Sequence, residues 1–150
     1  MKKQQGFTLI ELVMVIVILG VLSATALPKF VSLQQDAKIA SLKGMKASLQ
    51  TAVQIAHAKA LIQGANPAGD SWVDMNNNGI KTLADGDVYV RFLYPSHNDN
   101  GLQNLIELDG FTRVDNQFRL TSNIANCAVF YRHPNSQGDS PTFTIVSSAC

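Results

Sequence analysis

"MKKQQGFTLIELVMVIVILG" occupies residues 1–20 and opens the apolar segment of the chain. Between Phe7 and Pro28 the only charged residue is Glu11. A helix needs about 20 mostly apolar residues to cross a bilayer, so this segment is long enough to do so. A carboxylate inside such a helix costs about 2.5–3.5 kcal/mol on insertion scales. Glu11 therefore needs an explanation beyond membrane anchoring.

A cleavable secretion signal is one explanation of the segment. Two lysines precede an apolar core, and "ATA" at residues 24–26 has the small-x-small form of a signal peptidase site. Cleavage after Ala26 would release a soluble binding protein that begins at Leu27. A peptide that is discarded would gain nothing from Glu11, which argues against this interpretation.

The residues "KKQQGFTLIELV" at 2–13 closely resemble the start of type IV prepilins and the related pseudopilins. In that family a short basic leader ends in glycine, a membrane-embedded prepilin peptidase cuts after it, and the new first residue is N-methylated. The resemblance implies a cleaved leader over 1–6, cleavage between Gly6 and Phe7, and methylation of Phe7. Glycine suits the cleavage position because it has no side chain to obstruct a protease.

The resemblance also gives Glu11 a role. Cleavage would create an ammonium group at Phe7, four residues from Glu11. Breaking a buried ion pair is strongly unfavourable, so a carboxylate in the membrane is tolerated only when it is paired. In the family, the Glu11 of an incoming subunit would pair with the Phe7 amine of a neighbour. The unpaired charge would then drive addition of the subunit to a filament.

The pattern after the apolar segment predicts that one helix continues to about Gln63. Apolar residues recur at three- and four-residue steps and therefore share one helix face: Leu42, Met45, Leu49, Val53, Ala56 and Ala60. Gly64 and Pro67 form a stop signal. We expect a helix over 7–63, about 85 Å long, with 7–28 as its membrane or filament-core segment.

Gly20 and Pro28 are the weak points of this predicted helix. Proline removes a helical hydrogen bond and kinks the helix, and glycine lowers helix stability. The resemblance implies that a stretch between a glycine and a proline placed in this way can lose helicity in the assembled fibre. The matching stretch here is 20–28.

Residues 64–150 are expected to form a globular head with antiparallel strands, which gives the whole chain an α+β fold. Short runs rich in β-branched and aromatic residues predict strands at 88–94, 105–108, 128–131 and 142–146. The last two runs are predicted to pair as a hairpin. We expect the strands to pack on the patterned face of the helix.

The chain has two cysteines, Cys127 and Cys150. An even count this small in an exported protein favours one disulfide, although two buried free thiols are the alternative. A loop of this span would contribute roughly 3 kcal/mol on the chain-entropy model. A disulfide that closes the carboxyl-terminal region is also what the resemblance to type IVa pilins implies.

"DMNNNGIKTLAD" at 74–85 has the spacing of a calcium loop. The candidate ligands are the side chains of Asp74, Asn76 and Asn78, the carbonyl group of Ile80, and Asp85 at the twelfth position. The usual twelfth residue is a glutamate, whose longer side chain binds calcium through both oxygens. An ordinary Asn-Gly turn is the alternative, and no other cofactor is predicted.

The charged residues are unevenly distributed. Residues 29–63 hold five lysines and one aspartate, whereas 64–150 holds five cations and nine acids. The net charge of +1 gives no bias toward nucleic acid, so no nucleic-acid partner is predicted. The three histidines have no arrangement with a nucleophile that the sequence supports, and we predict that the protein is not an enzyme.

The resemblance implies the main subunit of a type IVa pilus, a helical homopolymer that serves attachment, haemagglutination and biofilm formation. Its partners would be copies of itself, the prepilin peptidase, the inner-membrane assembly machinery, and host or environmental surfaces. Before assembly it would cross the inner membrane once, with a cytoplasmic amino terminus and a periplasmic head. After assembly it would be extracellular. A major pseudopilin of a type II secretion system is the alternative.

Overall fold

The computed structural model describes residues 7–102, 104–120 and 124–150. The predicted leader, including Gly6, lies outside these described residues. The chain divides into two compact units, which we call unit 1 (Met1–Ala37) and unit 2 (Lys38–Cys150). Helix α1 (Leu9–Ile62) contributes to both units, within two residues of the predicted helix at each end.

The unit 1 part of α1 is helical throughout from Leu9, including Gly20 and Pro28. Two hydroxyl groups in the apolar stretch are satisfied within the helix. The Ser23 hydroxyl donates to the carbonyl of Leu19 at 2.7 Å, and the Thr25 hydroxyl donates to that of Leu22 at 3.0 Å. This back-bonding lets small polar residues lie in an apolar helix without unpaired groups.

The carboxyl end of α1 is closed as the sequence predicted. Gly64 adopts a left-handed conformation with φ 66°. The N–H of Ala65 donates to the carbonyl of Ala60 at 2.9 Å, and that of Gly64 to the carbonyl of Leu61 at 3.2 Å. This pair of bonds is a Schellman motif, which glycine favours because it has no Cβ.

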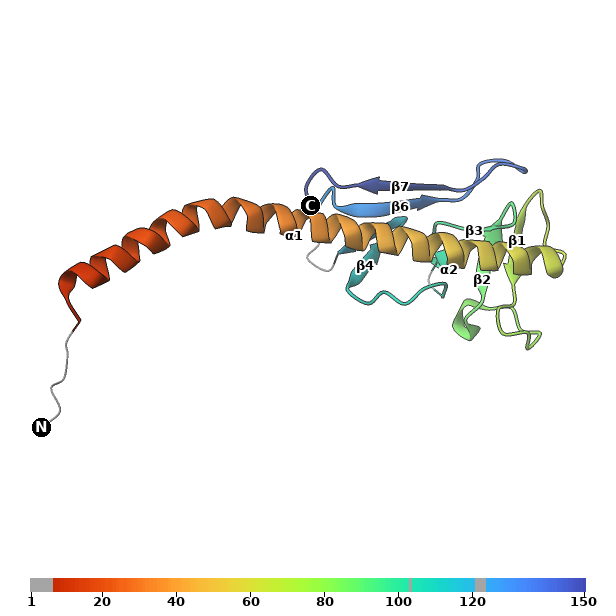
Figure 1. Cartoon of the computed structure of the whole chain (residues 1–150). Helices are drawn as coiled ribbons and strands as arrows, with labels where there is room; N and C mark the ends of the chain where they lie inside the picture. Colours follow the sequence, from red (N-terminus) through yellow and green to blue (C-terminus); the bar gives the residue numbers. More distant parts are fainter. Residues whose placement is uncertain (1–6, 103, 121–123) are drawn as a thin grey trace, which may run out of the picture. The chain divides into compact units, whose positions relative to one another are not determined.

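The described residues of unit 2 form two antiparallel sheets (Figure 1). The first sheet has the order β1 (Asp70–Val73), β2 (Val88–Arg91) and β3 (Tyr94–Pro95). The second has the order β4 (Phe111–Val114), β5 (Gln117–Leu120), β6 (Ala128–Arg132) and β7 (Thr142–Val146). A 3-10 turn, η1 (Leu83–Asp85), and a short helix, α2 (Asp99–Leu102), lie in the connections.

The six residues predicted to share one face of α1 are all buried. Ala56 and Ala60 pack with three valines of the first sheet, Val73, Val88 and Val90. The larger residues earlier in the helix pack with the second sheet in a cluster that includes Leu42, Met45, Leu49, Phe118 and Tyr131. The predicted α+β fold is therefore confirmed, including the packing of the strands on this helix face.

The strand predictions were correct in part. β6 and β7 pair as the predicted hairpin, with Phe130 opposite Thr144. The predicted strand 105–108 is wrong, because these residues form a turn after α2 in which Leu105 and Ile106 fill gaps in the core. β1, β4 and β5 were missed, because each is only four residues long and carries polar residues on its outer face.

The predicted strand 88–94 is also wrong in extent, because it is broken by a two-residue turn between β2 and β3. Phe92 and Leu93 both have positive φ, 51° and 70°. Such turns normally contain glycine or asparagine, so no sequence signal marked this one. Two contacts with other parts of the chain stabilise the turn. The N–H of Phe92 donates to the carbonyl of Gly69, and His57 Nδ1 forms a hydrogen bond with the Leu93 carbonyl at 3.1 Å.

Candidate functional site

Unit 1 presents an uncovered apolar surface. Every residue from 7 to 37 is exposed in the single chain. In the part of the chain that the structure describes, α1 is the one helix long and apolar enough to cross a membrane, and none of its most apolar window is buried. A helix that is apolar on all sides must be surrounded by lipid or by other helices.

Glu11 belongs to a capping box at the start of α1. The Thr8 hydroxyl donates to Glu11 Oε2 at 2.6 Å, and the Thr8 N–H donates to the same oxygen at 2.9 Å. The Glu11 N–H lies 3.4 Å from Thr8 Oγ1 in return. These reciprocal bonds satisfy donor groups that an uncapped helix would leave free. The sequence signal for this role was available as Thr-x-x-Glu before an apolar run.

The capping box occupies only one oxygen of the carboxylate. Among the described residues, Glu11 Oε1 has no hydrogen-bond partner. The helix dipole and the Thr8 donors hold the carboxylate at the amino end of α1. The Thr8 donors therefore hold the Glu11 carboxylate in place through Oε2. Its second oxygen, Oε1, can bind a cation that belongs to another chain.

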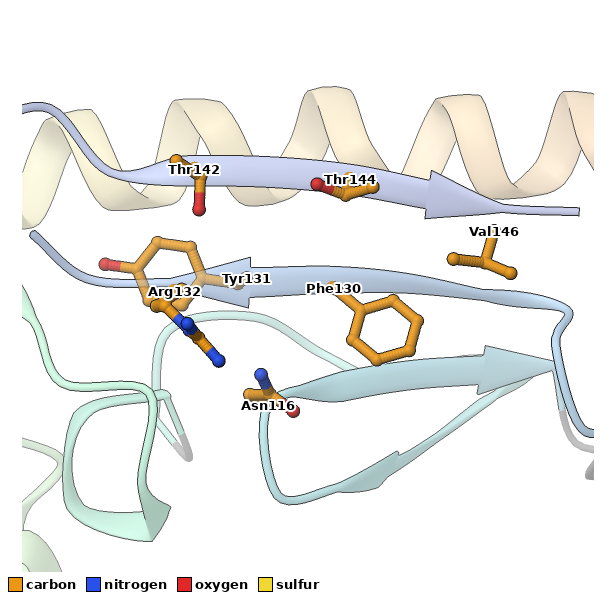
Figure 2. A pocket seen from close by; sticks show the side chains of 7 residues that line it. All are labelled: Asn116, Phe130, Tyr131, Arg132, Thr142, Thr144 and Val146. Carbon is orange, nitrogen blue, oxygen red and sulfur yellow. The ribbon is translucent and has the colours of Figure 1, made fainter.

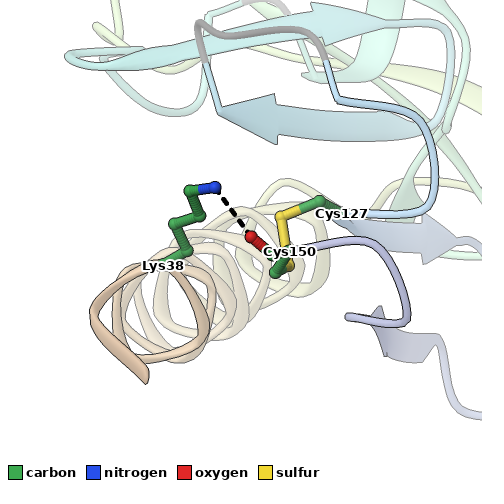
Figure 3. The surroundings of a disulfide bond; sticks show 3 residues. All are labelled: Lys38, Cys127 and Cys150. Atoms are coloured by element: carbon green, nitrogen blue, oxygen red, sulfur yellow. Dashed lines mark hydrogen bonds between the residues drawn. A yellow bond between two sulfur atoms is a disulfide. The ribbon is translucent and has the colours of Figure 1, made fainter. Parts of the chain in front are cut away.

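Cys127 and Cys150 form the predicted disulfide, with their Cα atoms 5.0 Å apart (Figure 3). It ties the end of the chain to the segment just before β6. Lys38 Nζ donates to the Cys150 carbonyl oxygen at 2.7 Å, so Cys150 is bonded to α1 as well as to Cys127. Lys38 was not among the predicted site residues, because nothing in the sequence relates positions 112 residues apart.

The candidate calcium loop is organised around Asp74. Its two carboxylate oxygens accept the N–H groups of Asn77 at 2.6 Å and Gly79 at 2.8 Å. Desolvation would raise the pKa of Asp74, but these backbone donors outweigh it and hold the pKa below its ordinary value. The fully buried Asp87 closes the loop by accepting N–H groups from Met75 and Thr82.

The donor set of the loop fits calcium only in part. Asn76 and Asn78 both turn their amide NH₂ groups toward Asp85 Oδ2. Their carbonyl oxygens accept the N–H groups of Asn78 and Ile80 instead of facing the same point. Calcium takes oxygen ligands, so both amides would have to turn around to bind it. This arrangement is the one expected of an Asn-Gly turn, and calcium binding stays a prediction.

His97 and His133 form a stacked pair that was not predicted from the sequence. Their Nδ1 atoms lie 2.6 Å apart, and the His97 N–H also donates to His133 Nδ1. His133 is almost fully buried, and desolvation together with the charge of His97 lowers its pKa to about 4. No short-range pattern could reveal this contact, because 36 residues separate the two positions.

Comparison with known proteins places these features in a family. The prokaryotic N-terminal methylation motif matches residues 1–27. The chain is 34% identical over 87 residues to the type IV narrow pilus major component PilA5 of Thermus thermophilus. This match covers 51% of the chain and 75% of that protein.

Two further relatives come from Pseudomonas aeruginosa. A fimbrial protein is 34% identical over 88 residues, which is 57% of this chain and 56% of that protein. The type II secretion system core protein G is 46% identical over 43 residues, or 29% of this chain and 30% of that protein. No solved structure matches the chain.

The matched regions agree with the structure. The methylation motif covers the apolar amino-terminal segment with Glu11, and the relatives are structural components of filaments or secretion systems, not enzymes. The Thermus relative is covered over most of its length, beyond the methylation motif alone. By these matches, together with its single long helix and antiparallel sheets, the chain belongs to the type IV pilin family.

Proposed function

We propose that the chain is the major structural subunit of a type IVa pilus, of the mannose-sensitive haemagglutinin kind. It polymerises into a surface filament that serves attachment, haemagglutination and biofilm formation. Pilus subunits among the relatives support this proposal. The disulfide-closed carboxyl-terminal region of unit 2 also favours a pilus subunit.

The observation that carries the proposal is an apolar surface interrupted by one half-satisfied carboxylate. The residues from 7 to 28, whose only charged side chain is Glu11, are uncovered in the single chain, and Glu11 Oε1 lacks a partner among the described residues. After removal of the leader, the ammonium group of a neighbouring Phe7 is the cation that Glu11 binds. Packing of copies covers the apolar surface, and the ion pair aligns one copy on the next.

This proposal includes a route through the cell. The prepilin peptidase cuts between Gly6 and Phe7, and Phe7 is then N-methylated. The subunit waits in the inner membrane with its amino terminus in the cytoplasm and unit 2 in the periplasm. The inner-membrane assembly machinery moves it into the filament, and residues 20–28 unwind there. Surfaces of hosts or of the environment are the final partners.

A major pseudopilin of a type II secretion system is the second candidate. Its support is the similarity of 43 residues to the secretion core protein of Pseudomonas aeruginosa, and the calcium-loop spacing at 74–85. Calcium bound by Asp74, Asn76, Asn78, Ile80 and Asp85 would favour this candidate. A pilus subunit with the hydrogen-bonded loop described above needs no calcium.

The test replaces the chromosomal gene in its native cells with Glu11→Ala. We expect surface filaments that contain this subunit to disappear, while the protein stays in the membrane fraction. Glu107→Gln is the matched control, because it removes an exposed carboxylate from unit 2 and should leave filaments unchanged. Normal filaments in Glu11→Ala cells would contradict the proposal. Loss of protein secretion without loss of surface filaments would favour the pseudopilin.

A further inference from the structure

The second sheet carries a hollow on the face that points away from α1. It has a volume of about 350 Å³ and we call it the β6–β7 hollow (Figure 2). The residues that line it are Asn116, Phe130, Tyr131, Arg132, Thr142, Thr144 and Val146. Ligand sites in proteins begin at about 300 Å³, so the hollow is large enough for one small ring compound.

Strand alternation produces this lining. Val129 and Tyr131 face the core cluster that contains α1, so Phe130 and Arg132 project from the other face. On β7, Thr144 lies opposite Phe130 and Thr142 lies opposite Arg132. Directly opposite residues have neighbouring side chains, so an aromatic ring, a guanidinium group and two hydroxyl groups lie close together.

Asn116 completes one side of the hollow. It lies in the turn between β4 and β5, and its carbonyl oxygen accepts the N–H of Tyr131 at 3.0 Å. This bond fixes the turn beside the end of β6. The Asn116 side chain reaches the same hollow, where Figure 2 shows it near Arg132. It adds an amide with both donor and acceptor atoms.

Arg132 gives the hollow its charge. Arg132 is exposed, and no acidic residue lines the hollow. Within the described ranges, 7–102, 104–120 and 124–150, no salt bridge involves Arg132. A guanidinium group binds a carboxylate through two parallel hydrogen bonds, which makes it selective for planar anions. The ligand that fits best therefore carries a carboxylate.

The remaining lining groups determine the rest of the ligand. A pyranose ring has an apolar C–H face that packs on an aromatic ring such as Phe130, and hydroxyl groups at its edge. The hydroxyl groups of Thr142 and Thr144 and the amide of Asn116 can pair with that edge. We propose that the β6–β7 hollow binds one carboxylate-bearing sugar residue of a surface glycan, with Arg132 on the carboxylate and Phe130 under the ring.

This inference rests on the proposed function for its biological use, because a filament would present the hollow on every copy of the subunit. The binding itself does not require a filament. It is therefore measured on the full-length chain in detergent micelles, whereas the function is tested by filaments on cells. Filaments without sugar binding would overturn only this inference, and sugar binding without filaments would overturn only the proposed function.

The experiment compares glucuronate with glucose, which differ at C6 alone, by saturation-transfer difference NMR on the solubilised chain. We expect glucuronate to bind at least about tenfold more tightly, because a charge-assisted pair replaces a neutral contact. Arg132→Gln should abolish this preference, and Phe130→Leu should weaken the binding of both sugars. Lys81→Gln is the matched control, because it removes an exposed cation outside the hollow.

Three outcomes would overturn the inference. Equal binding of the two sugars, or a preference that survives Arg132→Gln, would remove the role of Arg132. Displacement of glucuronate by inorganic phosphate at the same concentration would show a general anion site. Sugar binding that disappears as the chain self-associates in the micelles would show that a second copy of the chain occupies the hollow. Thermal melting of each variant checks that loss of binding is not loss of folding.

Discussion

Units 1 and 2 share helix α1 but depend on their surroundings in opposite ways. Every residue of unit 1 from 7 to 37 is exposed, so no other residue in the described part of the chain covers its apolar surface. Among its described residues, unit 2 has two clusters of buried apolar side chains, two sheets and a disulfide. One helix thus carries an uncovered apolar surface in its first half and part of the buried core in its second.

The largest effect is expected when leucine is replaced by alanine at a buried and at an exposed position of α1. Leu49 is fully buried, so Leu49→Ala should lower the free energy of unfolding by about 2–5 kcal/mol through the cavity it leaves. Leu19 is 55% exposed, and Leu19→Ala should change unit 2 by no more than about 0.5 kcal/mol. Denaturant unfolding in micelles measures both, and equal losses would contradict the division into two units.

The disulfide should contribute to unit 2 alone. Replacing both cysteines by alanine should lower the free energy of unfolding of unit 2 by roughly 3 kcal/mol, since the unfolded chain gains entropy when the cross-link is lost. The membrane association of unit 1 should not change. Urea unfolding and membrane fractionation provide the two measurements. Loss of the protein from the membrane fraction would show that the units are not independent.

Acid should destabilise unit 2 through His133. Its pKa is lowered to about 4 in the folded chain, whereas an unfolded histidine titrates near 6.5. Between pH 6.5 and pH 4 the His133 ring is mostly protonated in the unfolded state and mostly neutral in the folded state. The free energy of unfolding therefore falls as the pH falls toward 4. His97, Arg91 and Arg132 favour the neutral ring, and Asp70 opposes them.

The expected loss from this titration between pH 7.5 and pH 5 is about 2 kcal/mol. Thermal melting across that range measures it, and His133→Gln should remove this part of the pH dependence. His57→Gln is the control, because His57 bonds a carbonyl and stacks on Tyr94 outside the pair. An unchanged pH profile in His133→Gln would contradict this explanation.

The smallest expected effect is at Lys38. Lys38→Met should keep the packing of the side chain but remove the hydrogen bond to the Cys150 carbonyl, at a cost of about 1 kcal/mol. Lys46→Met is the matched control on the same helix. Thermal melting compares the two variants. An equal loss of stability in both would show that the hydrogen bond from Lys38 to Cys150 does not stabilise unit 2.

Sequence reasoning predicted the features that local patterns encode. The helix face from Leu42 to Ala60, the glycine stop at Gly64 and the hairpin of β6 and β7 all follow from short-range periodicity or turn residues. The disulfide followed from an even cysteine count. These features depend on a few neighbouring residues or on composition, and the structure agrees with them.

The missed features depend on contacts between distant residues. The Phe92–Leu93 turn is held by Gly69 and His57, and the Lys38 contact and the histidine pair join positions far apart in the sequence. The β6–β7 hollow arises only when two strands and a turn meet. The Thr8–Glu11 capping box is different, because its local signal was present but the carboxylate was interpreted through assembly alone.

The intact mass and amino-terminal sequence of the subunit in filaments sheared from native cells would show whether the apolar segment with Glu11 is part of the filament. We expect a chain that begins at N-methylated Phe7, retains Glu11, and lacks two hydrogens because Cys127 and Cys150 are bonded. A chain that begins at Leu27 would contradict this expectation, because the apolar surface and Glu11 would then be absent from the mature protein.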